Sequence, residues 1–201
     1  MTRQEIKARA KEQLGREIFG ENWLSAVLII LINTAIMAAG GALVGVGTVV
    51  ALVIAGPLEY GITKAFLKQT RDGQKIEVGT LFDGFKDDFT GNFALGLLMT
   101  LFIALWSLLF VIPGIVKSYA YSMAFYIKND HPDFTWKQCI DESQNMMRGH
   151  KMELFIQDLS FLGWMIVGEL CLGVGGLWVS AYVSAARSQF YENLLTAPQN
   201  S

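Results

Sequence analysis

The sequence predicts an all-α polytopic membrane protein, with about six transmembrane helices arranged as three hairpins and with amphipathic helices on the cytoplasmic side. Composition, one long uncharged segment and the placement of the cations all lead to this fold class. Of the 201 residues, 52% are hydrophobic and 17% are charged, whereas soluble proteins carry roughly 25% charged residues. Residues 93–112 contain no charge, and a helix of that length, at about 1.5 Å per residue, matches a hydrocarbon core of about 30 Å.

We expect a single integral membrane domain, residues 1–201, with a span at each of six apolar segments. These segments are residues 23–39, 42–66, 93–112, 115–127, 154–174 and 177–191. The second is interrupted by Gly56-Pro57, and the fourth and sixth are short enough to be tilted, partly immersed or re-entrant. Glycine or proline breaks at Gly40-Gly41, Pro113-Gly114 and 173–176 favour an antiparallel hairpin in each pair.

The cations fix the expected orientation. With the N-terminus inside, the inner segments hold every Lys and Arg of the chain except Lys117, which falls near the outer face. This bias towards one side is the positive-inside pattern of short loops. The polar residues 1–22 lead into an apolar stretch without a small-residue cleavage site, so residues 23–39 are expected to remain as a span. The sequence therefore predicts a multi-pass membrane protein with both termini in the cytoplasm.

Each hairpin follows a cytoplasmic amphipathic segment, which suggests parallel repeats over residues 1–70, 75–130 and 132–195. Thr2 with Glu5, and Thr135 with Gln138, have the spacing of a capping box at a helix start. A shorter segment begins near Thr80. These helices could serve to bind lipid or a partner protein. The alternative, which we favour, is that they only position the spans at the membrane interface.

Polar residues inside the spans are the candidate functional residues, because burying them in a membrane is costly. They form a predicted polar seam: Glu59, Lys64, Lys117, Asp158, Glu169, Ser184 and Arg187. Depth in the expected topology predicts an inner cluster, in which Glu59 and Asp158 meet Lys64 and Arg187, and an outer pair of Glu169 with Lys117. One interpretation is that the seam lines a polar pathway or a substrate site. The other is that its charges pair with one another and only hold the helices together, and we favour this structural interpretation.

Familiar catalytic chemistry is not found. The chain has no phosphate-binding loop, HExxH or GxSxG motif, and its histidines lie outside the spans. Asp83, Asp87 and Asp88 are expected to form a solvated acidic turn, not a metal site. Cys139 and Cys171 have no CxxC spacing. We expect no catalytic residue, metal or cofactor, and the alternation of acids and bases gives no basic face for nucleic acid.

Several stretches resemble the bacterial integral membrane family catalogued as domain of unknown function 975. They are residues 117–126 (KSYAYSMAFY), 147–151 (MRGHK), 158–164 (DLSFLGW), 185–187 (AAR) and 190–192 (FYE). The resemblance covers nearly the whole chain. It implies a multi-spanning protein of the bacterial plasma membrane, found mostly in Gram-positive bacteria, and brings no established activity or catalytic residue.

The sequence thus predicts a non-enzymatic scaffold, sensor or accessory module in the lipid bilayer, as a homo-oligomer or with other membrane proteins. The alternative is a small transporter or channel subunit that uses Glu59, Asp158 and Arg187, and a membrane-lipid enzyme is a distant third. A transporter requires a water-accessible cavity at the seam. A scaffold requires a dry, paired interior and an exposed interaction surface.

Overall fold

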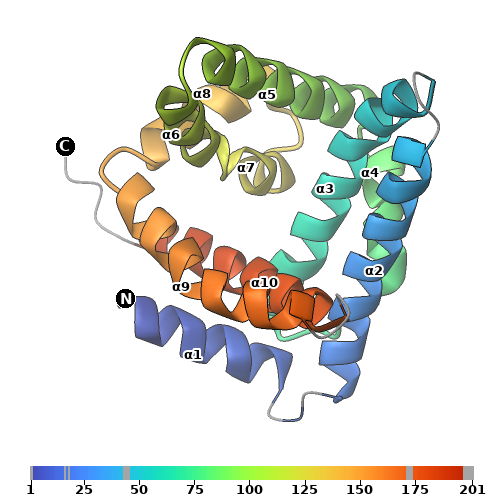
Figure 1. The fold of residues 1–201 in the computed structure, drawn as a ribbon, viewed down its shortest axis with the longest axis vertical. Coiled ribbons are helices and arrows are strands. Elements are labelled where there is room, and N and C mark those ends of the chain that lie inside the picture. Colours follow the sequence, from blue (N-terminus) through green and yellow to red (C-terminus); the bar gives the residue numbers. More distant parts are fainter. Residues whose placement is uncertain (1, 16, 18, 43–45, 171–173, 197–201) are drawn as a thin grey trace.

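The computed structural model describes residues 2–15, 17, 19–42, 46–170 and 174–196, and all regular structure in these ranges is helical (Figure 1). The longer helices are α1 (Arg3–Leu14), α2 (Glu21–Ala42), α3 (Val46–Asp72), α5 (Phe89–Leu109), α9 (Lys151–Leu170) and α10 (Val174–Thr196). The shorter ones are the 3₁₀ helix η1 (Val78–Phe82), α4 (Asp83–Lys86), α6 (Val111–Tyr121), α7 (Ala124–Asp130) and α8 (Trp136–Met146).

Three helix pairs make up the fold. The first is α2 with α3 and the last is α9 with α10. In the middle pair, the two consecutive helices α6 and α7 together are the partner of α5. In the last pair the rings of Phe161 and Tyr182 lie 5.0 Å apart. Gly168 lies after Phe161 in α9, Gly175 lies before Tyr182 in α10, and these two glycines also pack together. The two contacts show that α9 and α10 run antiparallel. Each pair follows one short amphipathic element in the chain, but the repeat of sequence itself stays a prediction.

The N-terminal end of α10 lies against the beginning of α2. The ring of Trp178 is 6.0 Å from that of Phe19, and the ring of Tyr182 is 6.2 Å from that of Trp23. This end of α10 therefore meets the part of the chain that leads from α1 into α2.

The C-terminal end of α10 lies against the C-terminal end of α3. The Glu192 carboxylate accepts a hydrogen bond from Arg71 Nε at 2.6 Å. The end of α3 and the start of α2 lie on the same side of their pair, because Lys75 and Glu21 form an ion pair. Both ends of α10 consequently contact one end of the α2–α3 pair, and α10 runs across that end (Figure 1).

This arrangement supports the expected bundle of three transmembrane hairpins only in part. Three helices within the described ranges are long and apolar enough to cross a membrane: Glu21–Gly40, Gly47–Asp72 and Phe89–Leu108. Neither α9 nor α10 is among them. The reason is composition: both helices carry polar and charged residues, among them Asp158 in α9 and Arg187 and Glu192 in α10.

Two helix breaks that the sequence predicted are not found at the expected residues. α3 continues through Pro57 without ending, although a proline removes one backbone hydrogen bond from a helix. The turn between α5 and α6 is the single extended residue Phe110, not Pro113-Gly114. Pro113 instead sits in the first turn of α6, where its missing N–H costs nothing. The third predicted turn, at 173–176, begins outside the described residues.

The helix α3 crosses α5 where two glycines meet. A Cβ atom added to Gly56 would overlap the carbonyl oxygen of Asn92, and one added to Gly96 would lie 2.6 Å from Gly56 Cα. Such close approach of two backbones requires residues without side chains. The crossing brings the start of α5 to the middle of α3.

The amphipathic helices begin as predicted, with capping boxes at Thr2 and Thr135. They are packed against the helix pairs instead of standing free at a surface. α1 buries Ile6, Ala10 and Leu14, and Tyr182 donates its hydroxyl to the Lys7 carbonyl at 2.9 Å. Burial of one face of a helix, more than its intrinsic propensity, is what stabilises so short an element.

The glycine crossing leads to the first prediction. Gly56→Ala should destabilise the fold by about 1–3 kcal/mol, because the new methyl group has no room, and should lower the melting temperature measured in detergent. Gly163→Ala is the matched control, since Gly163 is also inside a helix but has no atom near the added Cβ. Equal melting temperatures for the two variants would contradict the close crossing.

Candidate functional site

The centre of the polar seam is an ion pair between α9 and α10. Arg187 Nη2 donates to Asp158 Oδ2 at 2.7 Å. Tyr119 of α6 donates its hydroxyl to the same oxygen at 3.2 Å. The Asp158 side chain is 18% exposed and that of Arg187 is 40% exposed. The predicted contact of Asp158 with Arg187 is therefore present, and its arginine side is partly exposed.

Glu59 of α3 lies near this pair but does not join it. Among the residues that the structure describes, no cation is within ion-pair distance of its carboxylate, although the charge of Arg187 acts on it. The Glu59 residue is exposed, and Ser184, one turn before Arg187, is partly exposed. These two seam residues thus face accessible space near the ion pair.

Lys64 does not belong to the expected inner cluster, which is a correction. Its ammonium binds Asp83 at 2.9 Å and Asp87 at 2.6 Å. The hydroxyl of Tyr60 also donates to Asp87, at 3.4 Å. The acidic turn expected at residues 83–88 is accordingly a set of ion-pair partners. One turn of helix separates Lys64 from Glu59, which is enough to place their side chains in different surroundings.

Lys117 of α6 lies beside α8. Its ammonium donates to Gln144 Oε1 at 3.2 Å, and it stands 5.3 Å and 5.7 Å from the ring centroids of Trp106 and Tyr121. The side chain of Glu169 lies outside the described residues, so the pairing of Glu169 with Lys117 stays a prediction.

Buried polar atoms without partners gather around Asp158 and Arg187. They are both amide atoms of Gln157, Oδ1 of Asp158, Nε of Arg187 and Oγ of Ser188. Gln157 and Ser188 are themselves completely buried. Most buried polar atoms in proteins have a hydrogen-bond partner, often an ordered water. Ordered water is the usual partner of such atoms in this kind of position.

A second charged cluster, which the sequence did not reveal, joins three helices. Arg71 of α3 donates through Nη2 to Asp130 of α7 at 2.8 Å and through Nε to Glu192 of α10. Tyr191 donates to the same Asp130 at 2.7 Å. Burial tends to raise the pKa of Asp130, but the hydrogen bonds from Arg71 and Tyr191 outweigh it and hold this pKa below its ordinary value.

A third cluster is built on Lys128, whose side chain is only 3% exposed. Its ammonium binds Asp88 at 2.8 Å and donates to the carbonyls of Pro132 and Phe134 at 2.7 and 2.8 Å. Three donors thus meet three acceptors. The hydrogen bond with Lys128 holds the pKa of Asp88 below its ordinary value. The only sequence signal was that Lys128 ends an apolar stretch.

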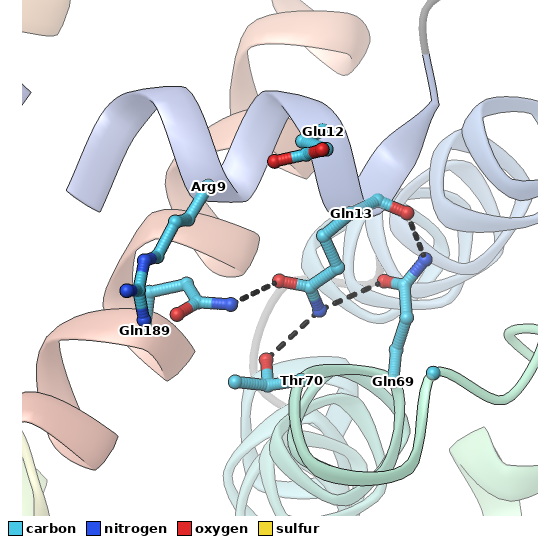
Figure 2. Close-up of a pocket in the computed structure, with 7 residues that line it drawn as sticks. Arg9, Glu12, Gln13, Gln69, Thr70 and Gln189 are labelled. Carbon is cyan, nitrogen blue, oxygen red and sulfur yellow. Dashed lines mark hydrogen bonds between the residues drawn. The ribbon is translucent and has the colours of Figure 1, made fainter. Parts of the chain in front are cut away.

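Amide side chains form the network drawn in Figure 2, where α1, α3 and α10 meet. Gln13 Nε2 donates to Thr70 Oγ1 at 2.8 Å, and Gln189 Nε2 donates to Gln13 Oε1 at 2.9 Å. Gln69 donates to the Gln13 carbonyl at 3.1 Å. These residues line a surface hollow of about 330 Å³ with Arg9, Glu12 and Gly73. The network attaches α1 to the rest of the fold.

Metal-binding and thiol chemistry have little support in the described ranges. No group of three or more His, Cys, Asp or Glu residues there is arranged to hold a metal ion. Burial raises the pKa of the Cys139 thiol to about 11, so this cysteine is a poor nucleophile. Cys171 lies outside the described residues.

Comparison with known families identifies the chain. A family described as "Protein of unknown function (DUF975)" matches residues 1–117 and 108–198. The chain belongs to this family. The resemblance carried by residues 117–126, 147–151 and 158–164 is thereby confirmed. No curated protein and no solved structure matches the DUF975 chain.

The central ion pair of this DUF975 protein leads to the second prediction. Asp158→Asn and Arg187→Gln should each destabilise the fold, and the double variant should cost less than their sum by about 0.5–3 kcal/mol, as for residues in direct contact. The free energy of unfolding in detergent measures this coupling. A control cycle of Asp158→Asn with Lys64→Gln should be additive, because Lys64 binds other carboxylates. Coupling in the control but not in the first cycle would contradict the assignment.

The lowered pKa of Asp88 leads to the third prediction. A carboxyl whose pKa is lower in the folded state stabilises the fold above its ordinary pKa of about 3.9, and this contribution is lost as the pH falls further. Asp88→Asn should therefore lower the melting temperature at neutral pH and weaken its decline in acid. Asp141→Asn, on the exposed face of α8, should leave the acid profile unchanged. An unaltered profile for Asp88→Asn would exclude this role.

Proposed function

We propose that this protein is a multi-pass protein of the bacterial plasma membrane, with both termini in the cytoplasm, that acts as a non-enzymatic scaffold or accessory module. The observation that carries this proposal is the pairing of the seam cations. Lys64 binds two aspartates, Lys117 binds Gln144, and Arg187 binds Asp158. Charges that are already satisfied by protein groups hold helices together and leave no free cation to capture a substrate.

The membrane location is supported by the apolar surface. Large apolar side chains are exposed on α2, α5 and α9, among them Leu28, Leu105 and Ile166. Exposed apolar area on this scale is rare in soluble monomers. The pair of α2 and α3 supplies the crossings in this proposal, and the exposed face of α9 supplies the contact with lipid, with another copy or with other membrane proteins.

The cytoplasmic position of the termini is supported by the polar clusters. Gln13 at the end of α1 and Gln189 near the end of α10 bind one another. Arg71, at the end of α3, binds Asp130 and Glu192 nearby. The ends of these helices share one charged side of the fold, which carries Arg71 with its partners and lies next to the basic helix α1, as expected for the cytoplasmic face.

A small transporter or channel subunit is the second candidate. It is favoured by the exposed, unpaired carboxylate of Glu59 and by the buried polar atoms without partners on Gln157 and Ser188. A polar ligand crossing the membrane would need such groups along its path.

Accessibility of Ser184 distinguishes the two candidates and is the fourth prediction. In a variant without Cys139 and Cys171, Ser184→Cys in native membranes should resist a membrane-impermeant maleimide applied to either side, if the interior is dry. Lys137→Cys, on the exposed face of α8, is the reactive control. Labelling of Ser184→Cys at the rate of this control would reject the closed scaffold and favour an aqueous path.

A further inference from the structure

The most exposed apolar surface of the described residues is the tip where α5 turns into α6. Leu108 is 85% exposed and Ile112 is 75% exposed, and Phe110 and Val111 between them are nearly as exposed. Two backbone groups of the turn have partners within it. The Phe110 N–H donates to the Trp106 carbonyl at 3.1 Å, and the Phe110 carbonyl accepts from Gly114 at 3.3 Å. Apolar side chains as exposed as those of the tip favour hydrocarbon over water.

The helix α8 limits how deep this tip can enter. α8 begins beside Lys128, which binds the Phe134 carbonyl, and it continues along α6 and α7. Ser143 donates to the Ala120 carbonyl at 2.8 Å, and Gln144 accepts from Lys117. A polar helix thus accompanies α6 and α7 from Lys128 up to Lys117.

The outer face of α8 is charged, with Lys137, Asp141 and Asn145 exposed. Charged side chains at the centre of a bilayer are costly, so the part of α5, α6 and α7 that α8 accompanies is excluded from hydrocarbon. In α6, the residues between the turn at Phe110 and Lys117 lie beyond these contacts with α8. The five residues from Lys117 to Ile112 rise about 7–8 Å at 1.5 Å per residue. This depth is far below the roughly 30 Å of a full crossing.

Basic residues surround the base of the tip. Lys117 lies there, and Arg148 and Lys151 follow closely after Gln144 in the chain, with Arg148 exposed and Lys151 partly exposed. Cations at this position complement the anionic headgroups of a cytoplasmic leaflet. In the topology expected from sequence, Lys117 was the exceptional cation near the outer face. A tip that enters and leaves on the cytoplasmic side places Lys117 with all the others.

We propose that α5 and α6 form a re-entrant element whose tip, residues 105–116, enters the cytoplasmic leaflet of the bilayer and returns to the same side. Its partner is the lipid acyl layer with its anionic headgroups. α5 has the length and hydropathy to cross, but in this proposal the charged face of α8 keeps the first part of α5 out of hydrocarbon. The proposal rests on the membrane location proposed above.

Single cysteines test the proposal in the full chain, in native membranes and in a background without Cys139 and Cys171. Leu108→Cys and Ile112→Cys report on the tip independently of each other. Val50→Cys, exposed on α3, reports on the outer face, and Lys137→Cys reports on the cytoplasmic face. A membrane-impermeant maleimide is applied to intact cells and then to inside-out vesicles. A nitroxide attached at each tip cysteine is then tested for collision with oxygen and with a water-soluble nickel chelate.

We expect Val50→Cys to react only from outside, Lys137→Cys only from inside, and both tip cysteines from neither side. We also expect the tip nitroxides to collide with oxygen in preference to the nickel chelate. Labelling of the tip from outside would show a full crossing, labelling from inside would show a tip in water, and protection without oxygen preference would show a protein contact. Each of these results overturns the proposal. Failure of Val50→Cys to react from outside would instead reject the crossing by α2 and α3.

Discussion

The mutual placement of the three helix pairs depends on one guanidinium group, that of Arg71. It binds Asp130 and Glu192, which lie on α7 and α10. α3, α7 and α10 each belong to a different pair, so this residue fixes the point where all three pairs meet. Arginine suits this position because its planar group offers five donors in a fixed geometry, whereas the ammonium of lysine is a point charge on a flexible stem.

Two lysines extend the same principle along the chain. Lys64 and Lys128 bind the acidic segment that precedes α5, so the start of α5 is held against α3 and α7. The glycine crossing of Gly56 with Gly96 then determines how close the helices come. Buried ion pairs often add little net stability, because both charges lose their hydration. Their effect here is on geometry: they select one arrangement among several that would bury similar apolar area.

The sequence predicted the local structure well and the arrangement of the pairs poorly. Helix positions and both capping boxes depend on neighbouring residues, and the contact of Asp158 with Arg187 follows from their equal depth in an antiparallel pair. The partners of Lys64, by contrast, come from a segment outside the predicted spans. The path of α10 across the end of α2 and α3 depends on Glu192, whose partner is 121 residues away. No pattern of hydropathy contains that information.

The central site illustrates why charge pairing alone does not decide function. Glu59, Asp158 and Arg187 together carry one more negative than positive charge when all are ionised. In a closed apolar interior the extra charge would require a counter-ion or a proton. The structure instead leaves the Glu59 residue exposed and outside such an interior, while Asp158 and Arg187 form an ion pair. A structural role therefore accounts for the ion pair of Asp158 with Arg187. It gives no reason for a carboxylate at Glu59.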